Sequence, residues 1–201
     1  MKTLYWLAVT LVDSAFKAFC GVRFVNRERA VNEGGAIIAC NHASFLDPPF
    51  VATIYKAPIH FLARNTLFKG LFGKLIARLN AVPVDRDQAD LKSMKTIIRT
   101  LREGNRVLIF PEGTRTEDGE LLEAKAGVGM LIAKSGVPVQ PVRLLGTYET
   151  FPRSGKFRAH PLTAVVGDPI VFTPEELKTK SREGYQALAD RVMQAIAELE
   201  G

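Results

Sequence analysis

The chain has 201 residues, which is enough for one domain with a full hydrophobic core and too few for a second catalytic unit. Hydrophobic residues at 47% and charged residues at 24% exclude a disordered, collagen-like or coiled-coil chain, and also a polytopic membrane protein. The net charge of +6 favours an acidic partner such as nucleic acid, anionic lipid, a phosphorylated metabolite or an acidic carrier protein.

The first predicted element is a helix at the start of an apolar stretch from Leu4 to Phe24, which Asp13 and Lys17 interrupt. A membrane span needs ~20 apolar residues with few charges, so these interruptions argue against one. Trp6 near one end suits a helix that lies in a headgroup layer. We expect residues 1–22 to form a retained, membrane-associating helix, interfacial or re-entrant, with a true span and a core helix as alternatives.

Short apolar runs then alternate with amphipathic stretches, a pattern typical of an α/β layer fold. Several runs are rich in Val and Ile without polar alternation, as expected of strands covered on both faces. The predicted strands are Val22–Asn26, Ala36–Cys40, Ile59–Ala63, Ala81–Val84, Arg106–Phe110, Val137–Arg143 and Thr163–Gly167.

Two helices are predicted in the second half of the chain. Apolar residues at helical spacing indicate a helix over 91–101 that stops at Gly104. Thr173 and Glu176 form a capping box that opens a second helix. Its apolar face consists of Tyr185, Leu188, Val192, Ile196 and Leu199.

Another predicted helix carries Phe68, Phe72 and Leu75 on one face, with Lys69 and Lys74 alongside. Such a face most often packs into the core, so we expect it to be buried. The alternative is a membrane-facing patch that admits lipid.

His42 stands out because it follows a predicted buried strand, in a loop that ends at Asp47-Pro48. If a helix begins at Pro48, the intervening turn can fold the Asp47 carboxylate back onto the imidazole. That pairing fixes the tautomer and stabilises the imidazolium, so the two residues fit a general base and its orienter. The alternative is that Asp47 caps the helix and His42 is structural.

The segment Phe110-Pro111-Glu112-Gly113-Thr114-Arg115 follows another strand and offers backbone N–H groups, a hydroxyl and a guanidinium. Such a turn suits a phosphate, and an ordinary exposed turn with a solvated arginine is the alternative. A third strand end supplies Arg86. Polar side chains at three strand ends predict one shared pocket.

The cysteines and the other histidines receive structural interpretations. Cys20 and Cys40 form neither a disulfide framework nor a metal spacing, and Cys40 is expected to be buried instead of nucleophilic. His60 and His160 lie in strand-like contexts and are expected to be surface or satisfied core residues. We expect no metal site, because no compact ligand spacing occurs.

Four motifs, N-H-x-S-x-x-D, V-D-R, F-P-E-G-T-R and V-P-V-x-P-V, occur in that order. With them the chain resembles the glycerolipid acyltransferase family, in particular its 1-acyl-sn-glycerol-3-phosphate (lysophosphatidic acid) acyltransferases. The match covers roughly Val22 to Ile170, and the joint occurrence of the ordered motifs is highly specific. It implies a single glycerol-3-phosphate acyltransferase-like α/β domain over 23–201, with a central mixed sheet flanked by helices.

The resemblance also implies the reaction. An acyl chain passes from acyl-carrier protein or acyl-CoA to the sn-2 hydroxyl of 1-acylglycerol 3-phosphate and gives phosphatidate. The reaction takes place at the cytoplasmic face of the cell membrane, with no cofactor beyond the donor thioester. His42 would be the general base and Asp47 its orienter, without an acyl-enzyme.

Residues that match the remaining motifs would bind the substrates. Those expected to hold the phosphorylated acceptor are Arg64, Arg86, Glu112, Gly113, Thr114 and Arg115. Those expected to form an apolar wall for the acyl chain are Val137, Pro138 and Val139. Candidate oxyanion donors are the backbone N–H groups beside Gly113 or Gly127 and the side chains of Asn41 or Lys125. Asn80 replaces the glycine that usually opens the second motif, and asparagine also tolerates a positive φ.

Three rival functions are distinguishable. The same chemistry could act on another lysolipid, such as a lyso-ornithine lipid. A basic lipid-surface binding module could keep the fold without catalysis, although the presence of both His42 and Asp47 argues against it. A nucleic-acid-binding function has only the net charge in its favour, since no recognition helix or stacking motif occurs.

Overall fold

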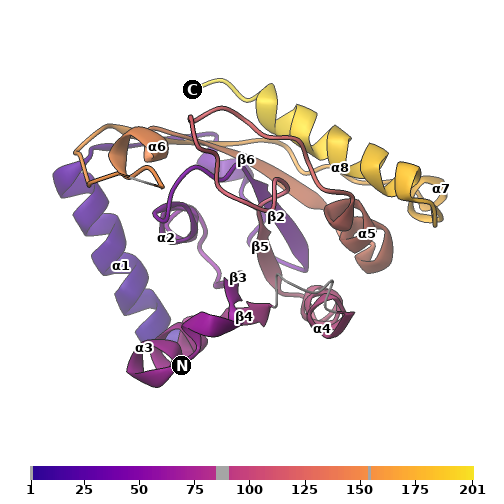
Figure 1. Ribbon diagram of the computed structural model, residues 1–201, viewed down its shortest axis with the longest axis horizontal. Coiled ribbons are helices and arrows are strands. Elements are labelled where there is room, and N and C mark those ends of the chain that lie inside the picture. The colour runs from indigo at the N-terminus through magenta and orange to yellow at the C-terminus, as the bar shows by residue number, and fades with distance from the viewer. Residues whose placement is uncertain (1, 85–90, 154) are drawn as a thin grey trace.

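The computed structural model describes residues 2–84, 91–153 and 155–201 (Figure 1). In these ranges the strands are β1 (Val22–Val25), β2 (Ala36–Cys40), β3 (Ile59–Arg64), β4 (Ala81–Val84), β5 (Arg106–Ile109), β6 (Val139–Leu145) and β7 (Leu162–Val166). The helices are α1 (Lys2–Phe19), α2 (Asp47–Ala52), α3 (Gly70–Arg78), α4 (Leu91–Arg102), α5 (Ala126–Ser135), α6 (Thr147–Thr150), α7 (Pro174–Leu177) and α8 (Arg182–Ala197), with 3-10 turns η1 (Arg27–Arg29) and η2 (Asn65–Leu67). Every predicted strand is present to within two residues.

The strands form one mixed sheet in the order β1-β7-β6-β2-β5-β3-β4. All neighbours are parallel except β6 and β7, which run antiparallel. Strands β2 to β6 therefore end at the same edge of the sheet, where ligands bind in open α/β folds. The expected single α/β domain with a central mixed sheet is confirmed.

The core consists of two layers because successive strand residues face opposite sides of the sheet. In β2, Ile38 packs with Phe16 of α1 and Phe50 of α2. Its neighbour Ile37 packs on the other side with α4, α5 and α8. Figure 1 shows these three helices on one side of the sheet and α1 and α2 on the other. This double cover explains why the predicted strands lack polar alternation.

Helix α1 is partly a core helix and partly a surface helix. Its inner face buries Phe16 and Tyr5, and the Tyr5 hydroxyl accepts a hydrogen bond from the Ile59 amide at 3.1 Å. Leu7 and Leu11 lie outside, each more than half exposed. Within the described ranges, no helix has the length and apolar character that crossing a bilayer requires.

The prediction of one continuous C-terminal helix is wrong, because this region contains two helices, α7 and α8. Thr173 and Glu176 do form a capping box, but the helix they open, α7, ends after four residues. Ser181 then starts α8 by accepting a hydrogen bond from the Gly184 amide at 3.0 Å. His160 likewise lies in the exposed segment before β7 and not in a strand.

The expectation that the apolar face of α3 packs into the core is also wrong. Phe72 and Leu75 are exposed, whereas Gly73 and Ile76 are the buried residues of this helix. The helix packs against the rest of the domain through the side that carries Gly73 and Ile76, so its larger apolar side chains point away from the core. Asn80, which follows α3, has a φ of 67° and fills the glycine position as predicted.

Candidate active site

The loop after β2 brings His42 and Asp47 together. Nδ1 of His42 lies 2.8 Å from Oδ2 of Asp47, so the predicted contact is confirmed. Asp47 begins α2 with Pro48 in its first turn, but its side chain does not cap that helix. It turns back instead and accepts hydrogen bonds from the amides of Ala43 and Ser44, both at 2.7 Å. The capping alternative is therefore wrong.

This arrangement fixes the imidazole. A carboxylate can only accept hydrogen bonds, so Nδ1 of His42 carries the proton and Nε2 keeps its lone pair. Asp47 is fully buried, and the His42 ring stacks on Phe110 with 3.8 Å between ring centroids. The ring is thus held from two sides, and Nε2 is the nitrogen that can accept a proton from a substrate.

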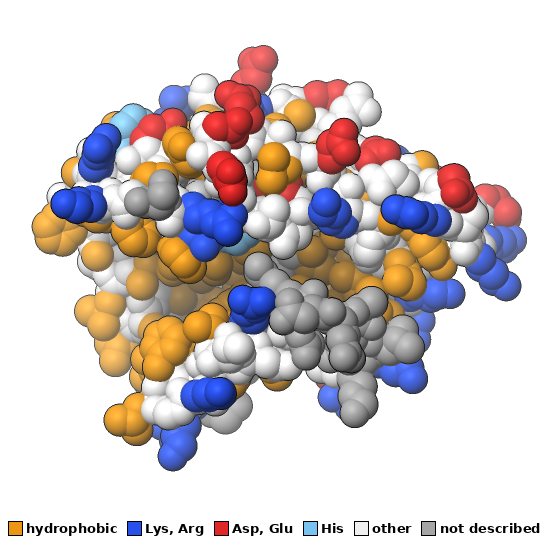
Figure 2. All heavy atoms as spheres, in the orientation of Figure 1, with side chains coloured by type: hydrophobic (Ala, Val, Ile, Leu, Met, Phe, Trp, Pro, Cys, Tyr) orange, Lys and Arg blue, Asp and Glu red, His pale blue; other side chains and the backbone are white. Residues whose placement is uncertain are grey.

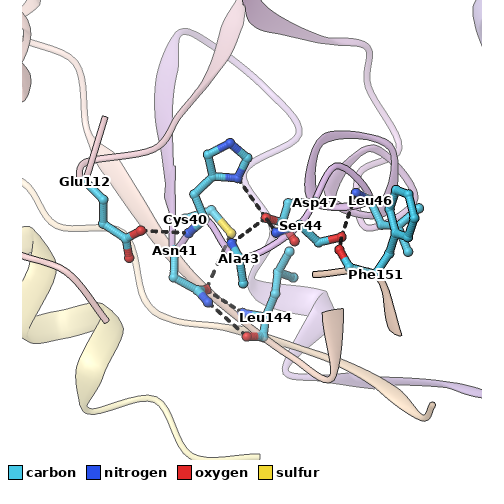
Figure 3. A network of polar contacts seen from close by, with 10 residues as sticks. Cys40, Asn41, Ala43, Ser44, Leu46, Asp47, Glu112, Leu144 and Phe151 are labelled. Atoms are coloured by element: carbon cyan, nitrogen blue, oxygen red, sulfur yellow. Dashed lines mark hydrogen bonds and ion pairs between the residues drawn. The ribbon is translucent and has the colours of Figure 1, made fainter. Parts of the chain in front are cut away.

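Glu112 was expected to bind the acceptor, but its side chain is buried behind the loop that carries His42. Its side chain is only 1% exposed, and Oε2 accepts a hydrogen bond from the His42 amide at 3.2 Å. Figure 3 shows Glu112 on one side of the loop backbone and Asp47 on the other. Burial raises the pKa of Glu112 to about 7, against the hydrogen bonds from the His42 and Leu122 amides, and the charge of Asp47 adds to the rise. Glu112 supports the loop and does not present its carboxylate to a phosphate.

The turn after β5 is joined directly to the loop that carries His42. The Thr116 amide donates to the carbonyl oxygen of His42 at 2.9 Å. Gly113 has a φ of 72°, and its amide donates to the Phe110 carbonyl at 3.0 Å. Gly113 and Thr114 are exposed on this turn. The two predicted motifs therefore form one structural unit.

Of the predicted cations, Arg115 is placed at this unit. Its guanidinium carbon lies 3.5 Å from the centroid of the Phe45 ring, which belongs to the loop after β2. Arg64 ends β3 at the same edge of the sheet and pairs there with Val84, the last residue of β4. Arg86 lies outside the described residues.

The structure does not bring the predicted acyl wall to the site. Val139 begins β6 and pairs with Ile37, five residues before His42 along the neighbouring parallel strand. At about 3.3 Å per residue, this separation is roughly 16 Å. Val139 lies in the core, and Val137 and Pro138 precede it at the opposite edge of the sheet.

Two polar residues of the first motif, Asn41 and Ser44, shape the loop through contacts that the motif did not predict (Figure 3). The Asn41 side chain donates to the Leu144 carbonyl at 3.0 Å and accepts from its amide at 2.8 Å, which extends the contact between β2 and β6. The buried Ser44 hydroxyl donates to the Phe151 carbonyl at 2.7 Å. Both partners lie more than 100 residues away along the chain.

Cys40 is buried, as predicted, at the end of β2. Burial raises the pKa of its thiol well above the usual range, and the charges of Asp47 and Glu112 add to this rise. The nucleophilic thiolate is therefore strongly disfavoured.

An apolar pocket of about 230 Å³ adjoins the loop, between α1 and α2. Helix α1 contributes one wall, and Phe45 and Leu79 lie among the residues that complete it. Phe45 thus lines the pocket and also stacks under Arg115. This pocket could not be predicted from sequence, because it depends on how α1 packs. Its α1 residues are Tyr5, Ala8, Val9 and Val12.

Known proteins match this chain in sequence and in fold. The sequence model of the family described as "Acyltransferase" matches residues 21–145. The 1-acyl-sn-glycerol-3-phosphate acyltransferase of Bacillus subtilis is 32% identical over 185 residues, covering 90% of this chain and 88% of that protein. The protein of the same name from Limnanthes douglasii is 37% identical over 137 residues, covering 65% of this chain and 48% of that protein.

A solved structure agrees with these sequence matches. The crystal structure of the 1-acyl-sn-glycerophosphate (LPA) acyltransferase PlsC from Thermotoga maritima superposes with a TM-score of 0.77 at 25% identity. The alignment covers 98% of this chain and 81% of that one. Because the family match includes the segments that carry His42, Asp47 and Arg115, the resemblance is confirmed, and the chain belongs to the acyltransferase family.

Proposed function

We propose that the chain transfers an acyl group from an acyl thioester, carried by acyl-carrier protein or CoA, to the sn-2 hydroxyl of 1-acylglycerol 3-phosphate. The product is phosphatidate. The observation that carries this proposal is one loop that holds both the His42–Asp47 pair and Phe45, whose ring contacts the Arg115 guanidinium and lines the apolar pocket. An acceptor with an anionic headgroup and an apolar chain fits these three features together.

The chain's own residues suffice for the proton transfers. Nε2 of His42 takes the proton of the acceptor hydroxyl as its oxygen attacks the thioester carbonyl carbon. Asp47 stabilises the resulting imidazolium through Nδ1. When the tetrahedral intermediate collapses, the C–S bond breaks and the leaving thiolate takes the proton from Nε2. A thioester is already an activated donor, so this route needs neither an acyl-enzyme nor a further cofactor.

The oxyanion of the intermediate needs a donor, and the structure narrows the candidates. The Asn41 side chain is bonded to Leu144 and the Gly113 amide to Phe110. Lys125 passes beside Gly113 and precedes the first turn of α5, which includes Gly127. Amides of a first helical turn lack the carbonyl partner four residues back that later amides use, and in α5 the Val128 amide donates to the Lys125 carbonyl instead, at 3.0 Å. We assign this role to the start of α5.

The acceptor binds, in this proposal, with its phosphate at Arg115 and Arg86 and a chain in the pocket under α1. Arginine is suited to phosphate because its guanidinium can donate two parallel hydrogen bonds. We place the protein on the cytoplasmic face of the cell membrane, as a peripheral or re-entrant protein. The exposed Leu7 and Leu11 would enter the boundary between headgroups and acyl chains.

A product assay tests the proposal. Purified protein is incubated with 1-acylglycerol 3-phosphate and either acyl-carrier protein or CoA thioester, with the His42→Gln variant as control. We expect phosphatidate from at least one donor and almost none from the variant. If the protein acylated a lyso-ornithine lipid and formed no phosphatidate, the proposed acceptor would be wrong and the lyso-ornithine lipid would take its place. Vesicle binding without turnover on any acceptor would indicate a binding module.

A further inference from the structure

Four large apolar side chains form an exposed patch around α3, which we call the α3 patch: Leu67, Leu71, Phe72 and Leu75. Leu71 is 84% exposed and Phe72 is 58% exposed. Leu71 and Leu75 are four residues apart in the helix, so they are neighbours on one face. Single exposed apolar residues are common on protein surfaces, but a contiguous group of this size usually marks an interaction site.

Among the residues that the structure describes, the charged side chains on α3 and directly before it are all basic. The segment from Pro48 to Val84 contains five Lys or Arg residues and no Asp or Glu. An even spread of the chain's 21 acidic residues would place about four in these 37 positions. Lys69, Lys74 and Arg78 are exposed on or next to α3. Figure 2 shows basic and apolar side chains around this helix at the lower left, with the acidic side chains gathered on the opposite, upper part. The occupant that fits is apolar at its centre and anionic at its rim.

The patch also adjoins the apolar pocket of the site. Leu79, directly after α3, lines that pocket together with Tyr5, Ala8 and Val9 of α1. Figure 1 shows α3 next to the N-terminal end of α1. An apolar chain that leaves the pocket between these two helices needs apolar surroundings outside it as well.

From these observations we propose that the α3 patch inserts into the headgroup and acyl boundary of an anionic membrane leaflet, as a second contact besides α1. Lys69 and Lys74 then lie at the level of the lipid phosphates. A domain held by α1 alone could still rotate about the axis of that helix. A second contact through α3 prevents this rotation, so the two helices together fix the tilt of the domain as well as its height. This inference concerns binding alone and holds whichever lysolipid is acylated.

The test is the partition of the full chain onto vesicles of phosphatidylcholine and phosphatidylglycerol in equal amounts, measured by flotation. Leu71→Ser removes the most exposed side chain of the patch. Val171→Ser is the matched control, because Val171 is an aliphatic residue 72% exposed in the segment before α7. We expect Leu71→Ser to weaken the partition about tenfold, as for the loss of one buried leucine, and Val171→Ser to leave it unchanged.

Lys69→Gln combined with Lys74→Gln should weaken binding to these vesicles and leave binding to pure phosphatidylcholine unchanged. A reporter variant, Leu71→Trp with Trp6→Phe, should show a blue shift of its fluorescence on adding the anionic vesicles. Equal partition of Leu71→Ser and Val171→Ser, or a reporter without a shift on protein that floats, would overturn the inference. If Leu71→Ser abolished self-association of the chain but left vesicle binding unchanged, the α3 patch would instead be a contact between two copies of the chain.

Discussion

The first prediction concerns Glu112, whose buried carboxylate supports the loop that carries His42. Glu112→Gln keeps an oxygen for the His42 amide and removes the ionisable group. The pKa of Glu112 is raised from 4.5 to about 7, chiefly by burial. Between these two pH values the folded chain holds a proton that the unfolded chain has released. The free energy of unfolding of the natural chain therefore falls as the pH rises through this window and levels off above it.

The magnitude follows from the shift. One pKa unit corresponds to about 1.4 kcal/mol, so the full shift costs the folded state roughly 3 kcal/mol above pH 7. Relaxation of the loop around the ionised carboxylate lowers this cost, and part of the cost is already present at pH 5. We therefore expect the free energy of unfolding of the natural chain to fall by about 2 kcal/mol from this group between pH 5 and pH 8. Glu112→Gln lacks this dependence, and its stability relative to the natural chain should rise by that amount.

Urea unfolding of both proteins at pH 5 and pH 8 measures this change. Titrations elsewhere in the chain cancel in the comparison. With a urea dependence of about 2 kcal/mol per M, the midpoint of the variant should gain about 1 M relative to the natural chain between the two pH values. The same difference in midpoint at both pH values would show that Glu112 ionises in the folded chain as it does in water, and that its burial does not raise its pKa.

The site, the backbone and α1 each offer a further test. Arg115→Ala should raise the KM for 1-acylglycerol 3-phosphate about tenfold or more with little change in kcat. Unchanged steady-state kinetics would contradict the proposed contact between Arg115 and the phosphate. Asn80→Ala should cost about 1 kcal/mol in urea unfolding because φ is 67°, whereas Asn80→Gly should be nearly neutral; equal costs would contradict this reason. Leu7→Ser with Leu11→Ser should weaken vesicle binding without lowering the melting temperature. Deleting residues through Val22 should also destabilise the fold, since the inner face of α1 belongs to the core; a deletion that melts normally would speak against that packing.

The strands were predictable because their signal is local. Each buried strand, such as Ala36–Cys40, is a short apolar run ended by polar residues, and a sheet covered on both faces needs nothing more to specify it. The contact between His42 and Asp47 was predictable for the same reason, because the two residues are five positions apart and a helix starts at Asp47-Pro48.

Features that depend on distant partners could not be derived this way. Glu112 resembles a substrate ligand in the sequence, and only its contact with the His42 amide, 70 residues away, shows that it supports the loop. Val139 matches a motif, but strand direction places it at the opposite edge of the sheet. Amphipathic spacing gives no indication of which face of α3 packs inward: Gly73 and Ile76 are its buried residues, and a larger residue at Gly73 would meet the backbone of Phe68 just before the helix.

The central claim is that His42, oriented by Asp47, is the general base of acyl transfer. The most direct measurement is the single-turnover rate of phosphatidate formation by His42→Gln at saturating acceptor and donor, beside the natural chain. If His42 is the base, the rate should fall by ~10²–10⁴-fold while the unfolding midpoint and the acceptor affinity are retained. A folded His42→Gln enzyme that forms phosphatidate at close to the natural rate would contradict this claim.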